Sequence, residues 1–274
     1  MATSRSSQPH HPSTSAVLAE VTSGTADIHG HRLYWEACGA ASWPTVLLLH
    51  HGLGSSRAWK AQLPALASQG WRAIAYDRWG YGASDPRPAL DVPHFESDVR
   101  DLRALLDSLQ VDRAALIGHS DGGTIALYFA AQSPARVTAL VVVAAHIYVE
   151  PSMLPGIQSV AQAFKSDLRF RQGLRRAHGD QAEAVFYNWH QGWLRPENLS
   201  WDMRPQLRQV KCPTLVLQGE LDEHATPRHA QDLAEAVPQA ELWLVPGAHH
   251  MLPQEKPDEF NRRVIEFLAP IEAR

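Results

Sequence analysis

Residues 114–123 read AALIGHSDGG, a short apolar run followed by a serine with glycines two positions before and after it. The run is typical of a strand buried on both faces, and the apolar residues beyond it predict a helix over 123–132. Glycine at 118 and 122 allows a tight strand-to-helix turn that holds Ser120 in a strained backbone conformation above the sheet. The segment predicts a nucleophilic serine. The alternative is a glycine-rich turn with an incidental serine.

On both sides of this turn, β-branched runs alternate with amphipathic helical stretches, which predicts an α/β fold. We expect a mostly parallel, doubly wound sheet with helices on both faces. The predicted strands cover 20–29, 31–38, 45–50, 71–77, 114–118, 137–145, 214–219 and 241–245. The predicted helices cover 57–68, 95–109, 123–132, 227–236 and 258–268.

The alternation stops between residues 147 and 210, where the pattern is helical and aromatic without a convincing strand. We predict that 147–210 form a helical cap inserted after the sixth main strand of a core domain made of 19–146 and 211–274. Such an insertion would lie over the carboxyl edge of the sheet, where open α/β sheets bind ligands. Residues 1–18, rich in Ser, Pro and His, are predicted to be a mobile tail.

Composition excludes several classes of function. The net charge of −4 does not favour binding to nucleic acid or to an anionic membrane surface. No run of the sequence approaches the ~20 apolar residues of a membrane helix. Cys38 and Cys212 lie far apart, which favours a reducing compartment, and we expect a cytoplasmic protein. Despite 15 histidines, no metal-ligand spacing with a third ligand and no dinucleotide fingerprint occur, so no metal and no cofactor are predicted. The pattern leaves the choice between monomer and homo-oligomer open.

A serine hydroxyl needs a base, and the base needs an orienting acid. The strand over 214–219 runs into an acidic turn that contains Asp222, and the strand over 241–245 runs into His249 and His250. Each group follows a strand that we expect to be buried, in the chain order serine, acid, histidine. We predict a catalytic triad of Ser120, Asp222 and one of these histidines, whereas either residue alone would more often be an incidental surface group.

Stabilising the developing oxyanion requires two backbone N–H groups. Asp121, directly after the serine, is the first predicted donor. The second is Leu53, in the sequence HHGLG that follows the strand over 45–50. A plain strand-exit loop is the alternative for this second segment.

Five segments together resemble the α/β-hydrolase superfamily over about residues 30–268: HGLGSS, YDRWGYGASD, GHSDGG, PTLVLQGELD and VPGAHHMLPQEKPDEF. The resemblance implies the fold and the triad, and its spacing to Glu255 and Pro257 selects His250 as the base. This chain has His249 where the family commonly has glycine.

The elbow is most similar to those of small-ester hydrolases, including the valacyclovir hydrolase group. This resemblance implies hydrolysis of a small-molecule carboxylic ester through an acyl-enzyme. A C–C bond hydrolase or lactonase with the same triad, a cofactor-free lyase or oxygenase, and a ligand receptor with a vestigial site remain alternatives. The Asp121 carboxylate either attracts a substrate ammonium or points into the protein.

Aromatic residues of the predicted cap are candidates for the substrate pocket. The segment 186–193 is the most aromatic, and within it Trp189 and Trp193 are candidate substrate-binding residues. His146, which leaves the strand nearest the elbow, is a third. The alternative for each is a packing role that fixes the cap to the sheet.

Overall fold

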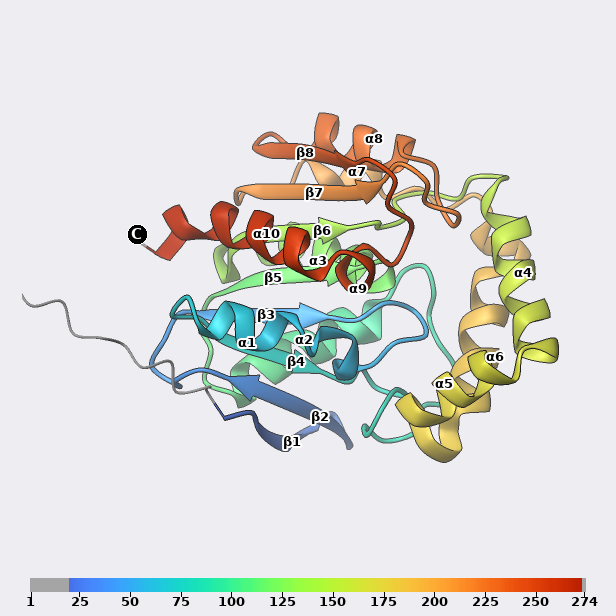
Figure 1. The fold of residues 1–274 in the computed structure, drawn as a ribbon, viewed down its shortest axis with the longest axis horizontal. Coiled ribbons are helices and arrows are strands. Elements are labelled where there is room, and N and C mark those ends of the chain that lie inside the picture. Colours follow the sequence, from blue (N-terminus) through green and yellow to red (C-terminus); the bar gives the residue numbers. More distant parts are fainter. Residues whose placement is uncertain (1–19, 273–274) are drawn as a thin grey trace, which may run out of the picture.

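The computed structural model describes residues 20–272, and its centre is an eight-stranded sheet (Figure 1). The strand order is β1-β2-β4-β3-β5-β6-β7-β8, with antiparallel pairing at β1–β2 and β2–β4 and parallel pairing elsewhere. The strands are β1 (Thr22–Ile28), β2 (His31–Cys38), β3 (Thr45–Leu49), β4 (Arg72–Tyr76), β5 (Ala114–His119), β6 (Val137–Val143), β7 (Thr214–Gly219) and β8 (Ala240–Val245).

Helices cover both faces of the sheet, because consecutive strand residues point to opposite sides. In β3, Leu47 and Leu49 pack in one apolar core, whereas Val46 and Leu48 pack in the other. The first core contains α2 (Glu96–Ser108), α3 (Asp121–Gln132) and α8 (Arg228–Ala236). The second contains α1 (Gln62–Ala67), α9 (Leu252–Glu255) and α10 (Pro257–Glu272), and Figure 1 shows α1 and α10 side by side in front of the sheet. The predicted α/β class is therefore what the chain adopts.

Between β6 and β7 the chain adds helices but no strand to the sheet. We call residues 147–210 the cap segment. Its helices are α4 (Met153–Ser166), α5 (Leu168–His178), α6 (Ala182–Trp193) and α7 (Arg204–Leu207), and short 3-10 turns occur at Gly179–Gln181 and Pro196–Asn198. Figure 1 shows α4, α5 and α6 beyond the arrow tips of β3, β6 and β7, at the carboxyl edge of the sheet.

The structure differs from the sequence prediction in several element boundaries and in the burial of one strand. The helix expected over 57–68 is divided into a 3-10 turn, Ser56–Trp59, and α1, because Pro64 is tolerated only in the first turn of a helix. Helix α3 begins at Asp121, two residues earlier than expected. The last strand, β8, is not buried as expected: it has a neighbour on one side only, and Leu242 is exposed.

Residues 1–18, the predicted tail, lie outside the described residues. Among helices within 20–272, none is both long enough and apolar enough to span a bilayer. Both cysteines are buried.

Candidate active site

The turn between β5 and α3 holds Ser120 in a backbone conformation that few side chains adopt. Its φ is 54° and its ψ is −122°. The Ser120 N–H donates to the Val143 carbonyl at 2.8 Å, which fastens the turn to β6. A Cβ at Gly118 would lie 2.3 Å from the Gly122 carbonyl oxygen, and one at Gly122 would lie 2.3 Å from that of Leu49. Both glycines are therefore required by close backbone approach, as the sequence predicted.

His250 and Asp222 meet at the same edge of the sheet. The His250 Nδ1 lies 3.0 Å from each carboxylate oxygen of Asp222. Asp222 Oδ1 also accepts from the backbone N–H groups of His224 at 2.9 Å and Ala225 at 3.2 Å. Burial alone would raise the pKa of the Asp222 carboxyl, but His250 and these N–H groups stabilise the anion and bring that pKa below its ordinary value. The pair is a carboxylate that holds an imidazole by Nδ1 and leaves Nε2 free for chemistry.

Geometry separates the two adjacent histidines. The side chain of His249 is 52% exposed, and its Nδ1 pairs with Glu255 at 3.0 Å. His250 is buried and donates its backbone N–H to Glu223 at 3.1 Å. Only the second imidazole is directed toward Asp222.

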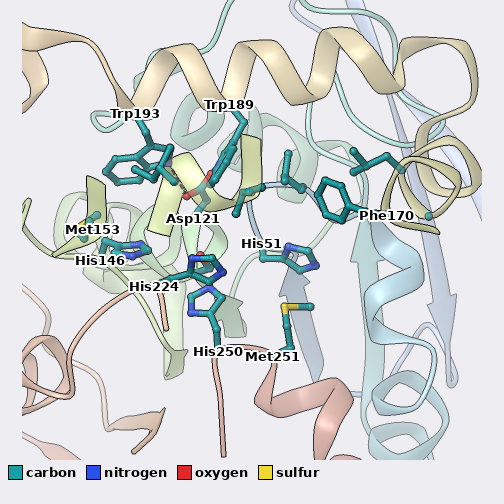
Figure 2. A pocket seen from close by; sticks show the side chains of 17 residues that line it. His51, Asp121, His146, Met153, Phe170, Trp189, Trp193, His224, His250 and Met251 are labelled. Carbon is teal, nitrogen blue, oxygen red and sulfur yellow. Dashed lines mark hydrogen bonds between the residues drawn. The ribbon is translucent and has the colours of Figure 1, made fainter. Parts of the chain in front are cut away.

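Ser120, His250 and the three candidate substrate-binding residues share one cavity of about 390 Å³. Within the described residues, no hydrogen bond joins Ser120 Oγ to His250, and catalytic hydrogen bonds are often long before substrate binds. Figure 2 shows Trp189 and Trp193 extending from one helix toward Asp121, and the ring of His224 next to that of His250, nearly perpendicular to it at 4.6 Å between centroids. The lining is mostly apolar and aromatic: His51, Gly52, Leu53, Ser120, Asp121, His146, Met153, Ile157, Val160, Phe170, Gly173, Leu174, Trp189, Trp193, His224, His250 and Met251.

The two residues whose backbone N–H groups are expected to stabilise an oxyanion, Leu53 and Asp121, lie at this cavity. Asp121 is the first residue of α3, so its N–H has no acceptor within the helix. Leu53 lies inside a turn closed by the Gly54 N–H donating to the His51 carbonyl at 3.0 Å. Both residues line the cavity, as the prediction requires.

A histidine of the cap segment supports the Leu53 turn. His178 is buried at the end of α5, and its Nε2 lies 3.1 Å from the Leu53 carbonyl oxygen. Its Nδ1 accepts from the Gly82 N–H at 2.9 Å, so the imidazole proton resides on Nε2 and is donated to Leu53. No motif in the sequence indicated this bridge, because it joins residues 125 positions apart.

The Asp121 carboxylate lies between the cavity and a buried ion-pair network. Trp193 Nε1 donates to Oδ1 at 3.3 Å, and Arg78 Nη2 lies 3.8 Å from Oδ2. Arg78 in turn pairs with buried Asp98 at 3.3 Å. Burial raises the pKa of the Asp121 carboxyl to about 6, against the opposing effect of Arg78. The side chain therefore both faces the cavity and ties the cap segment to the elbow.

The three candidate substrate-binding residues, Trp189, Trp193 and His146, all line the cavity. Elsewhere on α6 the aromatic side chains pack on the cap segment itself, with the ring of Phe186 stacked on Phe164 at 3.8 Å. Within the described residues, no group of three or more His, Cys, Asp or Glu side chains has the arrangement of a metal site.

Comparison with known proteins shows the family of the chain. The α/β-hydrolase fold model matches residues 44–206, more than half of the chain. The chain belongs to the α/β-hydrolase superfamily, as its motifs indicated, and it is a hydrolase.

Hydrolases with known names or structures match most of the length of this chain. It is 33% identical to serine hydrolase BPHL of Mus musculus over 254 residues, covering 90% of this chain and 87% of that protein. It is 28% identical to the 2-hydroxy-6-oxo-6-phenylhexa-2,4-dienoate hydrolase of Comamonas testosteroni, covering 84% and 89% of the two chains. The structure of a hydrolase from Pseudomonas aeruginosa superposes with a TM-score of 0.73 at 25% identity, covering 90% of this chain and 98% of the other.

Proposed function

We propose that this chain hydrolyses a small, uncharged carboxylic ester through an acyl-enzyme on Ser120. The observation that carries the proposal is that the His250–Asp222 pair opens into the same cavity as the serine of the strained elbow. Neutral His250 takes the proton of Ser120 as its oxygen attacks the ester carbonyl. The N–H groups of Leu53 and Asp121 stabilise the oxyanion, and the positive end of α3 adds to this effect.

His250 then returns the proton to the leaving alcohol and activates the water that releases the acid. Asp222 keeps the imidazole proton on Nδ1 between these steps, so Nε2 accepts and donates in turn. The mostly apolar lining of the cavity strengthens each of these charge interactions.

The cavity lining favours an uncharged ester over the main alternative. The Comamonas relative is named for a dienoate, which is an anion. In the described part of this chain, no Lys or Arg lines the cavity, and the one lining carboxylate, Asp121, would repel an anion. A neutral ester without a carboxylate fits this lining better.

Hydrolysis of p-nitrophenyl acetate, butyrate and octanoate by wild type and Ser120→Ala tests the proposal. Removing the nucleophile should lower kcat by roughly 10⁶-fold. The adjacent histidines provide a matched control, because His250→Gln should abolish turnover while His249→Gln retains it. Turnover that survives Ser120→Ala would contradict the assignment of the nucleophile. No turnover by wild type would favour the C–C hydrolase, lyase or receptor alternatives.

A further inference from the structure

His146 is a buried polar side chain that the proposed mechanism does not use. It follows β6, is 7% exposed and lines the cavity. Its backbone is fixed by Thr124, whose hydroxyl donates to the His146 carbonyl at 2.8 Å. Figure 2 shows the ring beside Met153, on the side of the cavity away from His51 and Phe170.

Three other aromatic rings lie around the His146 ring. Its centroid lies 5.4 Å from that of Trp193, 5.6 Å from that of His229 and 6.1 Å from that of His250. Burial lowers the pKa of His146 well below its ordinary value, and the nearby imidazoles add to the effect. The side chain is therefore neutral, with one N–H donor and one lone pair.

Both ring nitrogens of His146 lack a hydrogen-bond partner among residues 20–272. By contrast, the buried rings of His119, His178 and His229 each have at least one nitrogen paired with a backbone group. The His146 Nδ1 is sealed from solvent, whereas Nε2 is not among the sealed atoms and is the nitrogen that a ligand can reach. A ligand that supplies a hydrogen bond to Nε2 therefore gives this imidazole the partner that the protein does not provide.

We propose that His146 forms a subsite for a hydroxyl group on the substrate, so that the preferred esters carry a hydroxyl close to the scissile carbonyl. This inference rests on the ester hydrolysis proposed above. A hydroxyl both donates and accepts, so it pairs with Nε2 whichever tautomer the imidazole adopts. A carboxylate on the substrate would be repelled by Asp121, because no lining Lys or Arg would compensate its charge. A plain alkyl chain would leave His146 Nε2 without a hydrogen bond. The 6.1 Å between the rings of His146 and His250 places the hydroxyl within a few bonds of the reacting carbonyl.

Three esters on a matched skeleton test the subsite: ethyl butyrate, ethyl 3-hydroxybutyrate and 2-hydroxyethyl butyrate. The second carries its hydroxyl on the acyl side and the third on the alcohol side. We expect wild type to prefer one hydroxylated ester over ethyl butyrate by about tenfold in kcat/KM, the worth of one neutral hydrogen bond. His146→Phe should abolish this ratio, and His146→Gln, which keeps a hydrogen-bonding group, should retain most of it.

The ratio is measured within each variant, so a general loss of activity or stability cancels. Met153→Leu is the matched control, because it alters a neighbouring lining residue without changing its polarity, and its ratio should equal that of wild type. Equal rates on all three esters by wild type would overturn the subsite and leave the proposed function intact. A preference that persists in His146→Phe would also overturn it. No turnover of any ester would overturn the proposed function itself.

Discussion

Acid should destabilise this protein strongly, because the fold buries several imidazoles in the neutral form. Burial lowers the pKa of His50, His119 and His146 well below the ordinary value, and that of His51 to about 3. The unfolded chain binds a proton at each of these groups near pH 6.5, whereas the folded chain does not. Each group therefore removes about 1.4 kcal/mol of stability per pH unit as the pH falls below about 6.5.

Two buried carboxyl groups oppose this loss. Burial raises the pKa of Asp77 and Asp121 to about 6 each, above the value of about 4 in an unfolded chain. The folded state therefore takes up their protons first, which stabilises it as the pH falls below about 6. Near pH 5 the imidazoles with a lowered pKa outnumber the carboxyls with a raised pKa. The free energy of unfolding should therefore fall by about 1.4 kcal/mol per pH unit for each proton of that excess.

Urea unfolding followed by tryptophan fluorescence at pH 7.5, 6.5, 5.5 and 5.0 measures this slope. His119→Gln keeps a donor for the His250 carbonyl, and it should reduce the slope by about 1.4 kcal/mol per pH unit. The control, His29→Gln, should leave the slope unchanged because that side chain is exposed. A stability that stays constant, or increases, between pH 6.5 and 5.0 would refute the reasoning.

Two substitutions test the loop that carries Leu53. A Cβ at Gly52 would lie 2.2 Å from the Trp189 Nε1, so Gly52→Ala must displace the indole or the loop. We expect kcat/KM to fall at least tenfold. Unchanged kinetics would contradict this packing. His178→Phe removes the hydrogen bonds to Leu53 and Gly82. We expect kcat to fall about tenfold, and Tm in a thermal melt to fall by a few degrees. Wild-type values of both kcat and Tm would show that these hydrogen bonds are dispensable.

The features that sequence predicted well are local or periodic. The elbow is visible because a strand, two glycines and a helix follow one another around Ser120, and the structure shows why the backbone needs both glycines. The sheet is visible because buried parallel strands give continuous apolar runs. The edge strand β8 was taken for a buried one, since its place at the end of the sheet depends on the whole topology rather than on its own residues.

The features that sequence missed depend on contacts between distant residues. Trp193 reaches Asp121 across 72 positions, and His178 reaches Leu53 across 125. Arginine side chains are usually exposed, yet the fold buries Arg78 against Asp98 and near Asp121. No periodicity or spacing encodes such pairs, because the fold alone brings their partners together.

Long-range hydrogen bonds hold one end of the cap segment to the core. Three side chains tie the end of α5 and the following turn to the core. His178 bonds to Leu53, and the Gln181 amide donates to the Gly82 and Ser84 carbonyls at 2.8 and 3.0 Å. Arg57 donates to the Arg176 carbonyl at 3.1 Å. Moving this end would disturb the Leu53 turn that the proposed mechanism needs. In α4, Met153 and Ile157 contribute apolar contacts to the core, and Glu150, just before this helix, accepts hydrogen bonds from the hydroxyl and the backbone N–H of Thr226 at 2.8 and 3.2 Å. We therefore expect the α5 end to remain the fixed support of the Leu53 turn when substrate binds.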